Sequence, residues 1–130
     1  MPTIKFNDYN YDRCLVLQLA EKKNGDSLPV NMWLLDKNRA ILCEKNADIQ
    51  PAKLYELTDW IENLSKDSIP FELTELNMNF EWGHFEKGEL YFRLYVHCDN
   101  EKYILLDWYQ GETNARRVAA QMRDELSSIV

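Results

Sequence analysis

Hydrophobic and polar residues alternate along most of this chain, with the period of a β-strand that buries one face. In the first half the alternation covers residues 15–19, an apolar strand is expected over 29–35 and a further strand over 40–44 after a hairpin connection, and in the second half the alternation is more regular. Such a pattern predicts antiparallel strands that pack on a core through one face. The strands expected in the second half cover 76–82, 89–98 and 103–109, with the even-numbered residues directed inward.

Two stretches have the period of an amphipathic helix instead. The first predicts a helix over 51–65, with Pro51 near its start and Asp48 as its N-cap. The second predicts a helix over 113–129, capped by Thr113. The apolar stripes consist of Leu54, Leu57, Ile61 and Leu64 in the first helix and of Val118, Met122, Leu126 and Ile129 in the second.

The order of these elements is strands, helix, strands, helix. Because strands and helices do not alternate one by one, the order favours an α+β fold over a parallel α/β fold. We therefore expect a mainly antiparallel sheet of about six strands, with the two amphipathic helices packed on it. A length of 130 residues, with only four Gly and four Pro, predicts a single domain over 1–130 without linkers.

Acidic residues are concentrated in the second half. The formal net charge is -7, and residues 67–112 alone contain ten carboxylates and three cations. A field of this sign favours a cationic partner and disfavours direct contact with a nucleic acid backbone. The carboxylates of this segment are Asp67, Glu72, Glu75, Glu81, Glu86, Glu89, Asp99, Glu101, Asp107 and Glu112.

The sequence also indicates a cytoplasmic protein. Residues 1–8 lack the pattern of a signal peptide, and no apolar run approaches the roughly 20 residues that span a bilayer. Cys14, Cys43 and Cys98 are odd in number and form no C-x-x-C pair, so we expect reduced thiols in the core.

No catalytic or metal-binding motif is present, and we expect neither enzyme activity nor a metal or cofactor. His97 and Cys98 are neighbours, but strand alternation directs them to opposite faces, so they cannot form a nucleophile–base pair. His84 lies in a predicted hairpin loop over 82–88. A metal site formed by His84 with Glu81 or Glu86 is conceivable, but no ligand spacing supports it.

The outward side of the second-half strands is rich in tyrosine. Tyrosine and arginine are enriched at protein interfaces because they bury a large area and keep a polar tip. The alternative is a face that is merely half-solvated, or one that a helix or the first-half strands cover. Residues 44–48 and the exposed side of the first helix are the second choice of surface. The face contains Asn77, Asn79, Glu81, Tyr91, Arg93, Tyr95, Tyr103, Asp107 and Tyr109, of which Glu81, Tyr91, Arg93, Tyr95, Asp107 and Tyr109 are the predicted partner-binding residues.

Residues 54–122 resemble the WapI-type immunity proteins, which protect bacteria from polymorphic contact-dependent toxins, many of them nucleases. The resemblance covers about half of the chain and rests on patterns of Leu, Trp, Phe and Glu. It consists of LYELTDWIE at 54–62, TELNMNFE at 74–81, LYFRLYV at 90–96 and the closing helix. It implies a protein that binds and blocks a toxin and has no catalytic residues.

We therefore expect an immunity protein that neutralises a cationic toxin domain, without membrane or direct nucleic acid contacts, as a monomer or weak dimer. Another acidic inhibitor, such as a mimic of nucleic acid, is the first alternative, and a regular track of exposed carboxylates would favour it. A small-molecule binding module, or a hydrolase with His84 or His97 in a deep polar pocket, is the second.

Overall fold

A computed structural model describes residues 2–8, 12–63, 69–84, 90–98, 102–108 and 111–129 of the chain. Eight strands form two antiparallel four-stranded sheets, and within each sheet the strands lie side by side in chain order. The first sheet contains β1 (Thr3–Asn7), β2 (Arg13–Leu19), β3 (Leu28–Asp36) and β4 (Arg39–Ile49). The second contains β5 (Phe71–Leu73), β6 (Met78–His84), β7 (Leu90–His97) and β8 (Tyr103–Trp108), with a 3-10 helix, η1 (Thr74–Leu76), after β5.

The prediction of an α+β fold with one sheet of about six strands is wrong. The chain is mainly β, and its eight strands are divided between two sheets. Period-two alternation tells which face of a strand is buried, but it does not tell which strand or layer covers that face. Here the apolar inner face of each sheet is covered by the inner face of the other sheet.

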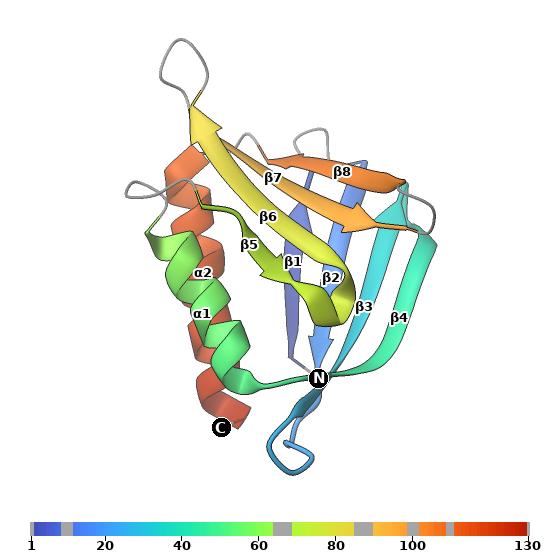
Figure 1. Cartoon of the computed structure of the whole chain (residues 1–130), viewed down its shortest axis with the longest axis vertical. Helices are drawn as coiled ribbons and strands as arrows, with labels where there is room; N and C mark the ends of the chain where they lie inside the picture. Colours follow the sequence, from blue (N-terminus) through green and yellow to red (C-terminus); the bar gives the residue numbers. More distant parts are fainter. Residues whose placement is uncertain are drawn as a thin grey trace.

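The two sheets form the layers of a sandwich, with the second sheet in front of the first in the view of Figure 1. The strands of the two sheets cross in this view, and aromatic rings contribute to the contact between the layers. Phe6 of β1 and Phe80 of β6 have ring centroids 5.6 Å apart. Trp60, from the first helix, packs against Phe80 and Phe92 at 6.3 and 5.9 Å. One aromatic cluster therefore joins both sheets and a helix.

The two helices, α1 (Pro51–Glu62) and α2 (Gly111–Ile129), lie side by side and close one side of the sandwich (Figure 1). The predicted N-cap Asp48 is wrong: β4 continues to Ile49 and the N-cap is Gln50, which makes no side-chain capping bond. Thr113 is not a cap either, since α2 already begins at Gly111. The predicted end of the first helix at 65 lies outside the described residues.

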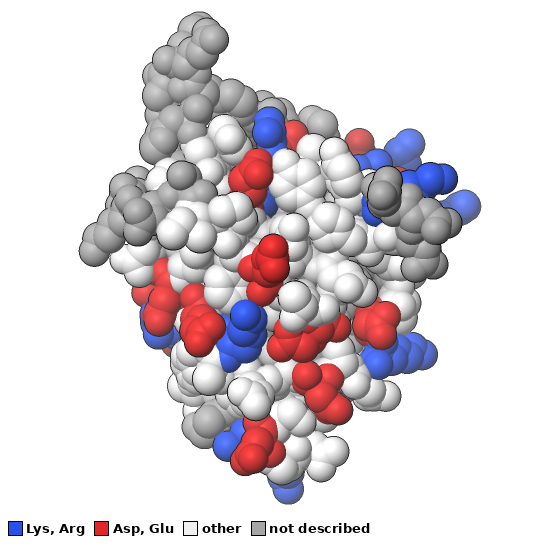
Figure 2. Space-filling view, viewed as in Figure 1, with Lys and Arg blue, Asp and Glu red and all other residues white. Residues whose placement is uncertain are grey.

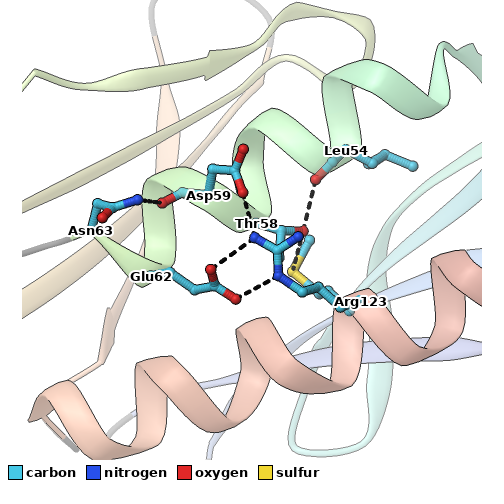
Figure 3. Close-up of polar contacts among 7 residues, drawn as sticks. Leu54, Thr58, Asp59, Glu62, Asn63 and Arg123 are labelled. Atoms are coloured by element: carbon cyan, nitrogen blue, oxygen red, sulfur yellow. Dashed lines mark hydrogen bonds and ion pairs between the residues drawn. The ribbon is translucent and has the colours of Figure 1, made fainter.

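A guanidinium joins the helices at their exposed side. Arg123 of α2 donates from Nε to Glu62 Oε1 at 2.6 Å and from Nη2 to Glu62 Oε2 at 2.8 Å (Figure 3). It also donates to Asp59. Beneath this contact the buried hydroxyl of Thr58 donates to Leu54 O at 2.8 Å, which satisfies the one buried polar side chain among the described residues. The two helices are thus joined at their exposed side by the ion pairs of Arg123.

Burial confirms the predicted orientation of the second-half strands where their side chains are described. Met78, Phe80 and Trp82 of β6 and Phe92, Leu94 and Val96 of β7 are buried, as is Leu106 of β8. The expectation of core cysteines is wrong. Cys43 is exposed, and Cys14 and Cys98 are half-buried, although all three are free thiols.

Candidate partner-binding surface

The outer face of the second sheet brings together most of the residues that the sequence assigned to it. The strand register places Glu81 of β6 opposite Arg93 of β7, and Arg93 opposite Asp107 of β8, so that the three form one row. In the next row Asn79 and Leu105 flank Tyr95. Paired residues of antiparallel strands share a face, so these side chains are neighbours on one surface.

Arg93 is the centre of this surface. Its Nε donates to Asp107 Oδ1 at 2.9 Å, and its Nη1 lies 4.0 Å from Glu81 Oε1. The Tyr95 hydroxyl donates to Glu81 Oε1 at 3.2 Å. Burial raises the pKa of Tyr95, and the Glu81 carboxylate raises it further, so the hydroxyl keeps its proton at neutral pH. We call these four residues, together with Tyr91, the Arg93 cluster.

Tyr91 belongs to the cluster because its ring contacts Arg93 and lies over a glycine. The guanidinium carbon of Arg93 lies 4.5 Å from the centroid of the Tyr91 ring, within the range of a cation–π contact. The ring itself lies over Gly83, its cross-strand neighbour, where an added Cβ would stand 2.5 Å from the Tyr91 hydroxyl oxygen. Only glycine at position 83 leaves room for Tyr91 in this position.

A second aromatic group adjoins the cluster. Tyr95 and Tyr103 are in edge-to-face contact with ring centroids 5.2 Å apart, and His97 follows at 6.2 Å from Tyr103. Tyr103 is 55% exposed and is among the most exposed large apolar side chains of the described chain. Tyr103 and His97 thus extend the tyrosine surface toward one end of β7 and β8.

The first sheet supports this surface from the side. Asp8 Oδ1 accepts a hydrogen bond from the Asp107 backbone N–H at 3.0 Å. Arg13 Nη1 donates to the Leu105 carbonyl at 3.0 Å. Both backbone groups belong to β8, the last strand of the second sheet, so the side chains of Arg13 in β2 and of Asp8 directly after β1 take the place of a further strand. This cover fixes the strand that positions Asp107.

Several predicted features lie outside the described residues. Tyr109 is one of them, as are Asp67, Glu86, Glu89, Asp99 and Glu101 of the acidic segment. Asn77 does not belong to a strand: it ends η1 with a φ of 53°. Figure 2 shows Asp and Glu residues spread among uncharged ones over the middle of the face that the second sheet presents, with fewer Lys and Arg there.

Sequence reasoning missed Gly83, Asp8 and Arg13 as parts of this surface, and it placed Tyr103 on the face without counting it among the partner-binding residues. Gly83 was expected in a hairpin loop, but β6 continues through it to His84. The signal for its role was an isolated glycine at the end of an alternating run, which indicates a close approach of another group. No sequence signal points to Asp8 and Arg13, because their contacts join residues about a hundred positions apart.

Among the described residues, two hollows are candidates for a small molecule. One of about 400 Å³ has a mainly apolar lining that includes Trp60, Ile69 and Phe71, and Glu56 and Asp59 also line it. The other, of about 470 Å³, is mainly polar and lies between β1 and α2. Neither is lined by His97. Among the described residues no group of three His, Cys, Asp or Glu side chains is arranged to hold a metal ion.

Comparison with known proteins returns no match to a family model, a curated protein or a solved structure. The resemblance to the WapI-type immunity proteins therefore stays a prediction. In the described part of the chain, neither helix is long and apolar enough to cross a membrane.

Proposed function

We propose that this chain is an immunity protein that binds a cationic toxin domain through the outer face of the second sheet. The observation that carries the proposal is the Arg93 cluster, in which hydrogen bonds and ring contacts hold three charged residues and two tyrosines in one arrangement. Side chains that are ordered before binding lose less entropy when the partner arrives, so such a surface binds more tightly for its area. The proposed place of action is the cytoplasm.

The net charge of -7 supports a cationic partner. Within the cluster, however, Glu81 and Asp107 already contact Arg93. We therefore assign them two tasks: they hold Arg93 and Tyr95 in place, and they contribute to the negative field that steers the partner. Tyr91 and Tyr95 are the proposed anchors.

This arrangement favours an immunity protein over a mimic of nucleic acid. A mimic requires carboxylates repeated along its surface as phosphates are repeated along a strand. Here a cation separates the described carboxylates of the central row, and tyrosines flank it. The two hollows give less support to a small-molecule module, since neither combines an enclosed apolar site with convergent polar groups.

The test is coexpression with the toxin domain that this proposal predicts in the gene directly upstream, together with binding kinetics at two salt concentrations. We expect Tyr95→Ala to speed dissociation and to cost about 2 kcal/mol, which is roughly thirtyfold in Kd. Glu81→Gln combined with Asp107→Asn should slow association and flatten its salt dependence. Amides are preferable to lysines there, because a lysine would repel Arg93 and disturb the cluster itself.

The matched control is Glu21→Gln with Asp26→Asn, which removes the same charge from exposed positions between β2 and β3. It should leave dissociation unchanged. A parent protein that neither binds nor protects against the toxin would refute the proposed function. Variants of the Arg93 cluster that bind and protect like the parent would instead move the surface to residues 44–48 or to the exposed side of α1.

A further inference from the structure

The hollow of about 400 Å³ lies between α1 and β5, which are neighbours in the fold (Figure 1). The sequence forms it at the start of β5. Pro70 has no N–H to donate to a ladder, and β5 begins at Phe71, so Ile69 and Pro70 lie beside the helix and outside the sheet. Trp60 Nε1 donates to Ile69 O at 2.7 Å and holds this segment against α1.

The lining of the hollow is mainly apolar. It contains Trp60 and Phe71, whose ring centroids are 6.3 Å apart, together with Ile69 and Pro70. Both rings also pack against Phe80 in the core, so the lining is held in place before a ligand arrives. Ile69 is 69% exposed, the highest value among the large hydrophobic side chains of the described residues. An apolar patch bordered by polar groups is typical of a binding surface.

The polar part of the lining comes from one face of α1. Glu56, Asp59 and Asn63 follow one another at spacings of three and four residues, so they share the face that presents Trp60. Asn63 Nδ2 donates to Asp59 O at 2.7 Å, and the Asp59 carboxylate pairs with Arg123 (Figure 3). Glu56 is exposed and forms no ion pair with another described residue. One carboxylate without a partner therefore stands beside the apolar lining.

A cation already contacts the aromatic part of this site. Lys53 Nζ lies 5.0 Å from the centroid of the Phe71 ring, within the range of a cation–π contact. Lys53 precedes Glu56 by three residues on the same helix, a spacing at which the two could pair. Because Lys53 is directed to Phe71 instead, the Glu56 carboxylate stays available to a cation from outside.

We propose that this hollow binds an extended peptide segment in which an apolar side chain is followed by a lysine or an arginine. The apolar side chain packs against Trp60, Ile69 and Phe71, and the cation pairs with Glu56. No residue of the Arg93 cluster lines the hollow, so this is a second site. The proposal does not depend on a toxin as the partner.

Charge selects this ligand over other apolar ones. An anionic segment would bring a further carboxylate close to Glu56 and Asp59, and like charges that meet at an interface are costly. A neutral segment would partly desolvate the Glu56 carboxylate without giving it a partner. The net charge of -7 adds a field of the same sign and disfavours a second copy of this chain as the occupant.

The indole N–H of Trp60 is a reporter inside the site, because it bonds to Ile69 O in the lining. NMR follows this group, and its resonance is identified by its absence from Trp60→Phe. Titration with acetyl-Leu-Lys-amide should shift the resonance saturably, with a Kd of roughly millimolar order for a ligand of about twenty non-hydrogen atoms. Acetyl-Leu-Glu-amide, which replaces the cation, and acetyl-Gly-Lys-amide, which lacks the apolar side chain, should each bind about fivefold more weakly or worse.

Variants of the lining test the same contacts from the side of the protein. Ile69→Ser removes exposed apolar surface, and Glu56→Lys replaces an attraction with a repulsion, so each should weaken the Kd for acetyl-Leu-Lys-amide by about fivefold. The matched controls are Ile41→Ser and Glu21→Lys, at exposed positions outside the lining, and they should bind like the parent. All four side chains are exposed, so the melting temperatures should change little.

Three results would overturn the proposal. The first is a Trp60 resonance that does not shift at a peptide concentration about tenfold above the expected Kd. The second is equal affinity for the cationic and the anionic peptide, or a Kd that either Ile69→Ser or Glu56→Lys leaves unchanged. The third is a Trp60 resonance that moves with protein concentration alone, which would assign the hollow to a second copy of the chain.

Discussion

Phe92 shows at the scale of one residue how the second sheet is held. Its side chain is 3% exposed, and its ring packs against Trp60 of α1 and Phe80 of β6. We predict that Phe92→Ala lowers the free energy of unfolding by about 3–5 kcal/mol, because the cavity remains when rigid rings surround it. Chemical denaturation measures this loss. Ile69→Ala, at a side chain that is 69% exposed, is the control and should change little.

A parent-like stability of Phe92→Ala would mean that this ring is not in the core. The inward orientation of Phe92 was predictable from the sequence because eight residues in succession alternate around it. The exposure of Cys43 was not predictable, since β4 is exposed on both faces and its apolar residues have no layer above them. Periodicity predicts a buried face only where a second layer is present to bury it.

Glu62 provides the clearest pH dependence. The hydrogen bonds from Arg123 hold the pKa of its carboxyl below the usual value. A carboxyl with a lowered folded-state pKa stabilises the fold above its unfolded pKa, about 4.3, and this contribution disappears as the pH falls through the folded pKa. We predict that Glu62→Gln lowers the melting temperature modestly at neutral pH and has no effect in acid.

Thermal melts of both proteins at about pH 7 and about pH 3 measure this difference. Glu56→Gln, an exposed change on the same helix, is the matched control and should leave the pH dependence as in the parent. An equal difference between Glu62→Gln and the parent at both pH values would show that the carboxylate charge does not contribute. The contribution is small in any case, because the pair is partly exposed and screened by water.

At the scale of elements, the cover of β8 determines how rigid the proposed surface is. Asp8→Ala removes the acceptor of the Asp107 N–H. We predict that this amide then exchanges its hydrogen roughly five- to tenfold faster, since a hydrogen bond contributes about 1 kcal/mol net. Hydrogen exchange followed by NMR measures the rate. The same substitution at exposed Asp12 is the control, and equal rates in all three proteins would contradict the assigned role of Asp8.

The elements differ in how well the sequence predicted them. The two helices were predicted within a few residues, because their apolar stripes extend over three or more turns. β1 and β5 were missed because they have only five and three residues, too few to establish a period. The N-cap of the first helix was placed too early, at Asp48, because β4 extends to Ile49, beyond the predicted strand 40–44. Of the proposed surface, the row of residues was predictable, whereas its lateral support by the first sheet was not.

At the scale of the whole molecule, the rings of Phe6 and Phe80 join the two sheets. We predict one cooperative unfolding transition, in which near-UV and far-UV circular dichroism coincide. Phe6→Ala, which removes a buried ring, should lower the free energy of unfolding by about 3–5 kcal/mol and shift both transitions together. Two separate transitions would contradict this, as would a shift in only one signal.

The division into two sheets was beyond sequence reasoning for a physical reason. Local pattern determines the strands and the neighbours that short turns impose, such as β3 and β4 across Lys37 and Asn38, both with positive φ. How the finished sheets stack depends on contacts between side chains far apart in sequence. Those contacts leave no local signal.

The chain order of the strands also bears on synthesis at the ribosome. In the described chain β1 to β4 form a ladder in chain order, so the first sheet has all its ladder partners once Ile49 has emerged. Its inner side chains, among them Leu15, Leu17 and Leu34, still face water until the second sheet is made. The nascent chain therefore passes through a stage with a complete sheet and a bare apolar side. That stage is the one at which a chaperone would bind it.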